Sequence, residues 1–264
     1  SERLRKLFIS RYGKPKRTFA MGYSMGGLLT VHALETQPKV YAGGLALCGA
    51  LAPSDTMMQR AFSVRAAFDH YFPGLLGALD PVPSDYMPDR KLGERVDAAM
   101  RANPTGSAAV RALAPATTED HFPGVVAFIT YVIKEMQQRA GANPFDNSDH
   151  VYVGTTDDIA LNAGVTRYRA DADAARYLIR WHSPTGKLER PLLALHTSGD
   201  PLVPASIAFD YALLTRKAER AHQFVQQYVP LEGHCTMTPE QTVGAFDDLV
   251  AWVGGTRPAS GLRH

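Results

Sequence analysis

One short segment constrains the fold of this chain more than any other, because it joins an apolar run to a helical pattern through a glycine-flanked serine. Residues 17–29 are RTFAMGYSMGGLL. The pattern predicts a strand over residues 17–23 and a helix over residues 25–36. Glycines on both sides of a serine permit a sharp turn that lifts the serine clear of a sheet, at the positive end of the following helix. The segment therefore predicts an α/β fold in which Ser24 is a candidate nucleophile.

Further strand and helix patterns alternate at both ends of the chain. A helix over residues 2–12 precedes the segment above, and an apolar run (YAGGLAL) follows it at residues 41–47. Towards the C-terminus, strands are predicted at 191–197 and 223–229, and helices at 206–220 and 239–253. Strand–helix–strand spacing of this kind is typical of a parallel sheet with helices on its faces.

The middle of the chain has a different character, since proline and glycine recur and no alternating strand pattern is present. It is predicted to be a mainly helical insertion over residues 53–190, inside a core formed by residues 1–52 and 191–256. Helices are expected at 92–102, 125–139 and 170–181. Its aromatic residues are expected to form a core rather than a substrate pocket; they are Phe68, Tyr71, Phe72, Phe122, Phe128 and Tyr131. The C-terminal residues 257–264 are expected to fray.

The composition excludes several classes of protein. The 28 Lys and Arg nearly balance the 26 Asp and Glu, so no nucleic-acid-binding surface is indicated. No apolar stretch is long enough for a membrane-spanning helix. The first residues, SERLRKLFIS, do not form a signal peptide, although a leader could precede this chain, so the compartment stays open between secreted, periplasmic and other locations. No spacing of His, Cys, Asp or Glu predicts a metal site, and no cofactor is expected.

A serine hydroxyl needs a base, a group that orients the base and donors for the oxyanion before it can act as a nucleophile. Asp200 and His234 each follow a predicted strand, in the chain order Ser, Asp, His. The ends of parallel strands meet at one edge of a sheet, so loops far apart in sequence can converge there. The alternative is a tight turn whose serine only caps the next helix; the two loops favour catalysis.

These three motifs resemble those of the α/β-hydrolase superfamily, in its serine esterase and lipase branch with a cap domain. GYSMGG resembles the nucleophile elbow of the superfamily. TSGDPLVP (residues 197–204, here called the acid loop) resembles the loop that carries the acid. EGHCTMTPE (residues 232–240, here called the histidine loop) resembles the loop that carries the base. The resemblance implies that residues 53–190 are a cap over the active site. It also implies that Ser24 attacks the acyl carbon, that His234 transfers the proton and that Asp200 orients His234. The backbone N–H of Met25 would donate to the oxyanion.

The leading functional prediction is hydrolysis of a carboxylic ester with a hydrophobic part, through an acyl-enzyme. A peptidase and an acyltransferase are alternatives of the same fold, because GYSMGG also resembles the elbow of homoserine acetyltransferases. A non-catalytic binding protein is the alternative from another class. An intact Ser, Asp and His set weighs against it. The expected partner is a small-molecule ester.

Ser24 stands early in the chain, and this predicts a further partner. In α/β-hydrolases several strands precede the elbow, and the loop after the third strand supplies a second oxyanion donor. Residues 1–23 have room for one helix and one strand and contain no such loop. We therefore expect an N-terminal fragment or companion chain to complete the sheet, since a bare apolar edge invites aggregation. The alternative is a natural minimal version with a rebuilt oxyanion hole.

Two cysteines and one further histidine are left without a firm role. Some secreted members of the superfamily tether the histidine loop through a cysteine beside the serine, but Tyr23 occupies that position here. A bond between Cys48 and Cys235 is compatible with their places near strand ends. Two free buried thiols are the commoner arrangement and are the expectation here. His196 lies inside a strand pattern and is expected to be a core residue.

Overall fold

The computed structural model describes residues 2–263, and its centre is a parallel sheet of five strands in the order β1-β2-β3-β4-β5. The strands are β1 (Phe19–Tyr23), β2 (Gly43–Leu47), β3 (Leu192–Gly199), β4 (Phe224–Glu232) and β5 (Gly261–Leu262). All neighbouring pairs are parallel. The predicted fold class, a parallel sheet flanked by helices, is confirmed.

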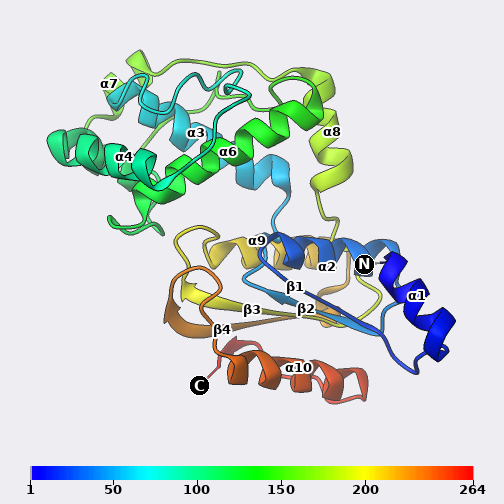
Figure 1. The fold of residues 1–264 in the computed structure, drawn as a ribbon. Coiled ribbons are helices and arrows are strands. Elements are labelled where there is room, and N and C mark those ends of the chain that lie inside the picture. The colour runs from blue at the N-terminus through cyan, green and yellow to red at the C-terminus, as the bar shows by residue number, and fades with distance from the viewer. Residues whose placement is uncertain (1, 264) are drawn as a thin grey trace.

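Helices cover both faces of this sheet (Figure 1). On one face lie α2 (Met25–Thr36) and α9 (Ser206–Lys217), and on the other lies α10 (Pro239–Val253). Helix α1 (Glu2–Tyr12) lies beside the sheet, and a short 3₁₀ helix (Ala221–Gln223) leads into β4. Every residue of β2 is buried. The reason is that its side chains enter the two apolar cores in turn, one beneath α2 and α9 and one beneath α10.

Between β2 and β3 the described chain contains helices and loops only. The helices are α3 (Ser54–Tyr71), α4 (Arg90–Ala102), α5 (Pro104–Ala112), α6 (Phe122–Ala140), α7 (Asp158–Gly164) and α8 (Ala172–His182). They pack on one another around α3 and α6 and enclose apolar cores of their own. Figure 1 shows this helical part above the side of the sheet that carries α2 and α9. Its assignment as a separate cap with bounds at residues 53 and 190 stays a prediction.

The helical part contains three helices that sequence patterns did not predict, namely α3, α5 and α7. Helix α3 was missed because its amphipathic pattern is weak: it carries a fully buried arginine among its apolar residues. The Arg65 side chain donates to Thr130 Oγ1 and to the carbonyl of Gly77, both at 2.9 Å, and pairs with Asp69 at 2.5 Å. The two hydrogen bonds and the ion pair offset part of the cost of burying the guanidinium, although Nη1 itself makes no hydrogen bond.

The aromatic residues of the helical part are divided between core and surface. Phe68, Phe72 and Phe122 are buried in one apolar cluster, which agrees with the core assignment. Phe128, by contrast, is exposed. It lies on α6 and is not part of that cluster, so the core assignment is wrong for this residue.

Residues 257–263, the described part of the C-terminal tail, are ordered by contacts with β4, which corrects the expectation of fraying over that range; His264 lies outside the described residues. Gly261 and Leu262 form β5 against β4. The Arg263 backbone N–H donates to the carbonyl of Tyr228 at 2.7 Å, and its guanidinium contacts Gln227 and Asp248. The short segment carries no strand pattern of its own, so only its pairing with β4 makes it a strand.

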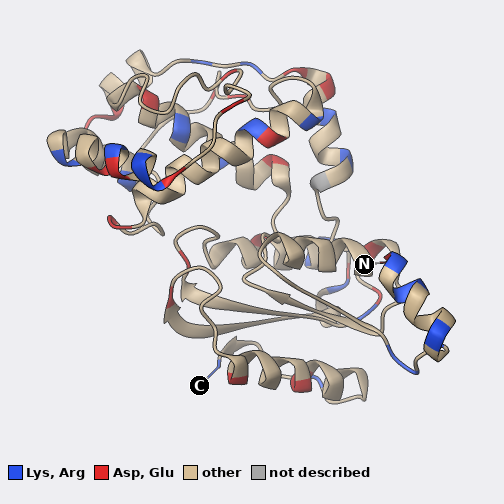
Figure 2. Cartoon of the chain, viewed as in Figure 1, with Lys and Arg blue, Asp and Glu red and all other residues tan. Residues whose placement is uncertain are grey.

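Strand β1 is at the edge of the described sheet and presents exposed Met21 and Tyr23. The companion segment expected to complete the sheet stays a prediction. Positive and negative side chains are interspersed over the helical part, whereas α1 is mainly basic (Figure 2). Among the described residues, no helix is both long and apolar enough to cross a membrane.

Candidate active site

Four strands end at one edge of the sheet, and within two residues of each end comes a residue of the candidate site. Ser24 follows β1, Cys48 follows β2, Asp200 follows β3, and the histidine loop follows β4. Because the strands are parallel and adjacent, their carboxyl ends bring these residues together although they are distant in sequence. The structure thus brings all three predicted triad side chains to one place.

The turn at Ser24 is sharp, and two of its glycines are required by close backbone contacts. Ser24 has φ 53° and ψ −118°, a region that non-glycine residues seldom occupy. A Cβ at Gly22 would lie 2.2 Å from the carbonyl oxygen of Gly26, and a Cβ at Gly27 would lie 2.6 Å from the Cα of Gly49. Nothing lies within 4 Å of a Cβ placed on Gly26. Gly22 and Gly27 therefore let the chain turn directly from strand into helix.

The Ser24 hydroxyl does not cap the helix that follows it. No side-chain capping hydrogen bond is present at this position. Instead Ser24 Oγ lies 2.9 Å from His234 Nε2. The hydroxyl is therefore directed at a base, as a nucleophile requires.

His234 also contacts Asp200 through its other ring nitrogen, with Nδ1 2.7 Å from Oδ2. A buried, ionised carboxylate only accepts hydrogen bonds, so Nδ1 carries the proton and Nε2 has a free lone pair for the Ser24 hydroxyl. The arrangement can accept the proton of the serine and stabilise the imidazolium that results.

The environment of Asp200 keeps it ionised. Burial by itself raises the pKa of this carboxyl, but hydrogen bonds from His196, His234 and the backbone N–H of Val203 outweigh burial and lower the pKa to about 2. Oδ1 accepts from the N–H groups of Leu202 and Val203 at 2.9 and 2.8 Å. The turn of the acid loop itself therefore fixes the orientation of the carboxylate.

His196 is a contributor to the site that the sequence did not identify as such. It is buried, as expected of a core residue. Its Nε2 lies 2.8 Å from the carbonyl oxygen of Val203 and 3.5 Å from Asp200 Oδ2. Since both neighbours are acceptors, Nε2–H points between them and joins β3 to the acid loop. The only sign of this role in the sequence was the position of His196 four residues before Asp200.

Cys48 and Cys235 form a disulfide, which corrects the expectation of two free thiols. Their Cα atoms are 5.3 Å apart. Cys235 Sγ lies 3.5 Å from His234 Nε2, the same atom that faces Ser24. The bond could form because β2 ends between the elbow and the acid loop, close to where the histidine loop returns. Cysteine counts alone could not show this proximity.

The backbone N–H of Met25 is a candidate donor to the oxyanion. Met25 is the first residue of α2, a position whose N–H has no partner within a helix. The positive end of the helix dipole adds to its attraction for a negative oxygen. The role of Met25 and the source of a second donor stay predictions.

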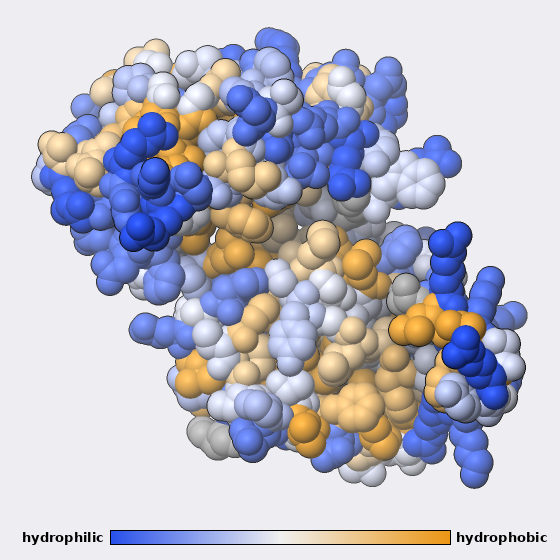
Figure 3. Space-filling model, in the orientation of Figure 1, coloured by the Kyte–Doolittle hydropathy of each residue, from blue (hydrophilic) through white to orange (hydrophobic). Residues whose placement is uncertain are grey.

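The helical part reaches the site through the acid loop. Thr117 Oγ1 donates to the carbonyl of Pro201, next to Asp200, at 2.7 Å. Met57 of α3 packs on the apolar cluster that contains Val203. Figure 3 shows apolar surface on both sides of the junction between the helical part and the part of the chain that forms the sheet. The helices that cover the sheet on this side are α2 and α9, and their large exposed apolar side chains are Met25, Leu29, Phe209 and Leu213.

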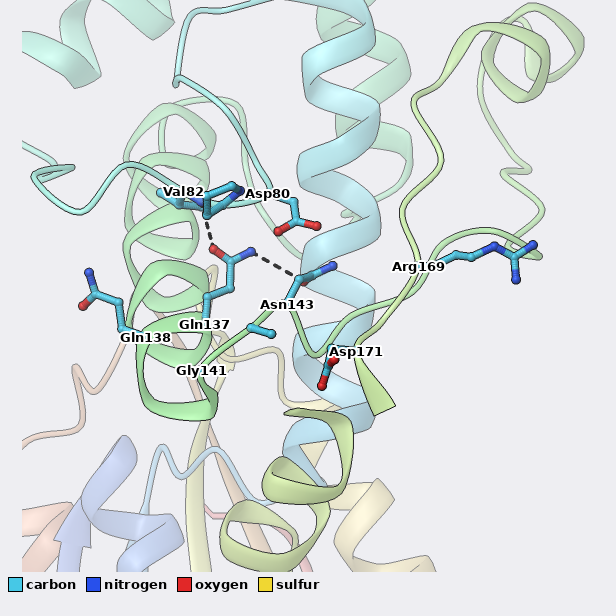
Figure 4. A pocket seen from close by; sticks show the side chains of 10 residues that line it. Asp80, Val82, Gln137, Gln138, Gly141, Asn143, Arg169 and Asp171 are labelled. Carbon is cyan, nitrogen blue, oxygen red and sulfur yellow. Dashed lines mark hydrogen bonds between the residues drawn. The ribbon is translucent and has the colours of Figure 1, made fainter. Parts of the chain in front are cut away.

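A hollow of about 500 Å³ lies within the helical part (Figure 4). Gln137 stands in its wall and makes hydrogen bonds to the N–H of Val82 and the carbonyl of Leu79, both at 2.9 Å. The side-chain amide of Gln137 thereby holds the loop that contains Leu79 and Val82 against α6. The hollow contains no residue of the Ser24 site and holds no arrangement of nucleophile and base.

Comparison with known proteins supports the fold assignment. Residues 7–91 match the family model described as phospholipase/carboxylesterase, which confirms the resemblance to the α/β-hydrolase superfamily. The matched segment contains Ser24, whereas Asp200 and His234 lie beyond it. No curated protein matches this chain in sequence.

Several solved structures of hydrolases are similar to the chain at low identity. An acylaminoacyl peptidase of Pyrococcus horikoshii is 10% identical with a TM-score of 0.41, over 94% of this chain and 25% of that one. A monoacylglycerol lipase of Paleococcus ferrophilus is 15% identical with a TM-score of 0.37, over 95% of this chain and 72% of that one. A thermophilic esterase of Thermogutta terrifontis is 14% identical with a TM-score of 0.39, over 93% of this chain and 69% of that one. The chain thus spans about a quarter of the length of the peptidase.

Proposed function

We propose that this α/β-hydrolase chain carries the nucleophile, base and acid of a serine hydrolase that cleaves carboxylic esters through an acyl-enzyme. One observation carries the proposal. Ser24 Oγ, His234 Nε2, His234 Nδ1 and Asp200 Oδ2 form a continuous relay with distances of 2.9 and 2.7 Å. The turn at Ser24 holds the hydroxyl in this relay and leaves it free of any capping bond.

The proposed reaction begins with the transfer of the Ser24 proton to His234 Nε2 while Oγ attacks the acyl carbon. The negative charge on the carbonyl oxygen is stabilised by the N–H of Met25. Asp200 stays ionised and offsets the positive charge on the imidazole. His234 then donates the proton to the departing alcohol, and water, activated by the same imidazole, hydrolyses the acyl-enzyme.

The substrate class is inferred from the surroundings of Ser24. Met25 and Leu29, on the helix that follows the serine, are mainly exposed. This helix, α2, lies on the side of the sheet that faces the helical part (Figure 1). Water-exposed apolar surface beside a reactive serine favours an ester with a hydrophobic acyl or alcohol part. The helical part would then act as the cap that forms the opposite wall.

The test uses two probes on the purified chain. A fluorophosphonate should label Ser24, and p-nitrophenyl esters of increasing acyl length should be hydrolysed with a preference beyond acetate. The Ser24→Ala variant is the matched control and should do neither. Labelling without hydrolysis of esters or amides would favour acyl transfer. The absence of labelling would contradict the proposal and favour a binding protein.

A further inference from the structure

The histidine loop has to cross the end of a strand before His234 can reach Ser24. Ser24 follows β1 and the histidine loop follows β4, with β2 and β3 between them. Neighbouring strands are about 4.8 Å apart, so β4 is separated from β2 by about 10 Å. Yet the Cα atoms of Cys235 and Cys48 are only 5.3 Å apart. The loop therefore leaves β4, passes over the end of β3 and comes close to β2.

Hydrogen bonds between the loop backbone and β3 account for only the first half of this crossing. The N–H of Gly233 donates to the carbonyl of Gly199 at 3.0 Å, and Thr197 Oγ1 donates to the carbonyl of Gly233 at 2.7 Å. Both partners belong to β3. These bonds thus hold Gly233, the residue before His234, to β3. The disulfide holds Cys235, the residue after His234, to Cys48 at the end of β2.

The backbone on both sides of the disulfide is in a conformation that cysteine seldom adopts. Cys48 has φ 44° and Cys235 has φ 59°. Left-handed backbone is unfavourable for residues with a Cβ and persists where the surrounding structure enforces it. Without the covalent bond, each of these residues would gain by turning to negative φ, and a turn at Cys235 would move the adjacent His234.

We propose that the Cys48–Cys235 disulfide is a positioning element for His234, and that its reduction lowers turnover while the protein stays folded. The disulfide acts through the backbone, by keeping Nε2 within 2.9 Å of Ser24 Oγ. The inference rests on the proposed function of Ser24 and His234. It adds to that function a dependence of the site on the redox state of the two cysteines.

Reduction by a dithiol is chemically balanced. A thiolate of dithiothreitol attacks the sulfur of Cys235, a partly exposed residue, and the thiolate of buried Cys48 leaves. The second thiol of the reagent then closes its ring and releases Cys235. Two electrons pass from dithiothreitol to the protein, which gains two thiols. Removal of the reagent and mild reoxidation should restore the disulfide.

The first experiment compares oxidised protein, protein reduced by dithiothreitol, the single variants Cys48→Ser and Cys235→Ser, and the double variant. For a short p-nitrophenyl ester we expect reduction to lower kcat by about tenfold to a hundredfold, as for other small displacements of a catalytic group. KM should change by less than about threefold, because substrate contacts are untouched. Each single variant should be as impaired as the double variant, since either change removes the same bond.

The controls separate positioning from unfolding and from reagent effects. Circular dichroism should show all forms folded at the assay temperature, and dithiothreitol should not alter the double variant further. Reoxidation of the wild type should restore kcat. Full kcat in folded, reduced wild type or in the double variant would overturn the proposal.

A second readout does not depend on activity. Reduction should speed amide hydrogen exchange at residues 233–238 of the histidine loop more than in β3 or α10. If the oxidised protein had no esterase activity, the proposed function would fail, yet the exchange measurement would still decide the positioning role. Unchanged exchange in this loop after complete reduction would contradict it.

Discussion

Ser24 Oγ and His234 Nε2 lie 2.9 Å apart although 210 residues separate them in the chain. Asp200 completes the relay on the far side of the imidazole. Every member of the relay follows a strand of one parallel sheet, so the rigid sheet sets their mutual distances. Changes to these side chains should accordingly affect chemistry much more than folding.

Ser24→Ala and His234→Ala should each lower kcat/KM for esters by at least about a thousandfold, because the three groups act as a unit. The double variant should be little worse than either single one. The measurement is steady-state hydrolysis of p-nitrophenyl butyrate, with unfolding in urea as a check that stability is retained. Retention of a tenth of the activity by Ser24→Ala would rule out this serine as the nucleophile.

Asp200→Asn should also be severe, by about a thousandfold or more, because an amide facing Nδ1 favours the wrong tautomer of His234. The turn of the acid loop should survive, since the remaining oxygen can still accept from the N–H groups of Leu202 and Val203. A variant with near-normal kcat would show that Asp200 does not orient the base.

The low pKa of Asp200 predicts how stability depends on pH. Its folded pKa of about 2 lies below the ordinary value of 3.8, so the ionised form is favoured by folding. The resulting stabilisation, about 2 kcal/mol, is fully present above pH 5 and is lost as the pH falls from about 4 to 2. The difference in unfolding free energy between wild type and Asp200→Asn should shrink over that interval. A difference that stayed constant would contradict the assignment.

His196 should stabilise the conformation of the acid loop through its contacts with Val203 and Asp200. In His196→Leu, both the carbonyl of Val203 and Asp200 Oδ2 lose a donor, so stability should fall by about 1–3 kcal/mol. The pKa of Asp200 should rise, and kcat should fall with little change in KM. His196→Gln retains a donor and should be milder, while His32→Gln, at an exposed position of α2, is the neutral control. Equal effects of the Leu and Gln variants would argue for packing alone.

Arg65 should be essential to the helical part but not to the chemistry. Arg65→Met leaves the carboxylate of Asp69 without its cation in a partly buried place, at a cost of about 3–5 kcal/mol. Burial raises the pKa of Asp69, so the variant should lose less stability at acid pH, where the carboxyl is neutral. Urea unfolding at two pH values tests this expectation. Combining the change with Asp69→Asn should recover part of the loss, and no recovery would contradict the pairing.

The local sequence determined the elements around the site and the chemistry of its residues. Apolar runs ending in Ser24, Asp200 and His234 predicted three parallel strands whose loops converge, because parallel strands of one sheet share an edge. Glycines around Ser24 predicted the sharp turn. The structure agrees, because a Cβ at Gly22 would have no room. These features depend on neighbours in sequence and on the periodicity of secondary structure.

Beyond the convergence of Ser24, Asp200 and His234, only the tertiary structure decided which distant residues meet. The disulfide of Cys48 with Cys235 depends on the path of the histidine loop across the end of β3, and the contact of His196 with Asp200 depends on the turn of the acid loop. The pairing of Gly261 and Leu262 with β4 likewise comes from a free strand edge and not from local propensity. Such contacts are set by the packing of the sheet as a whole, so no single segment of the sequence contains them.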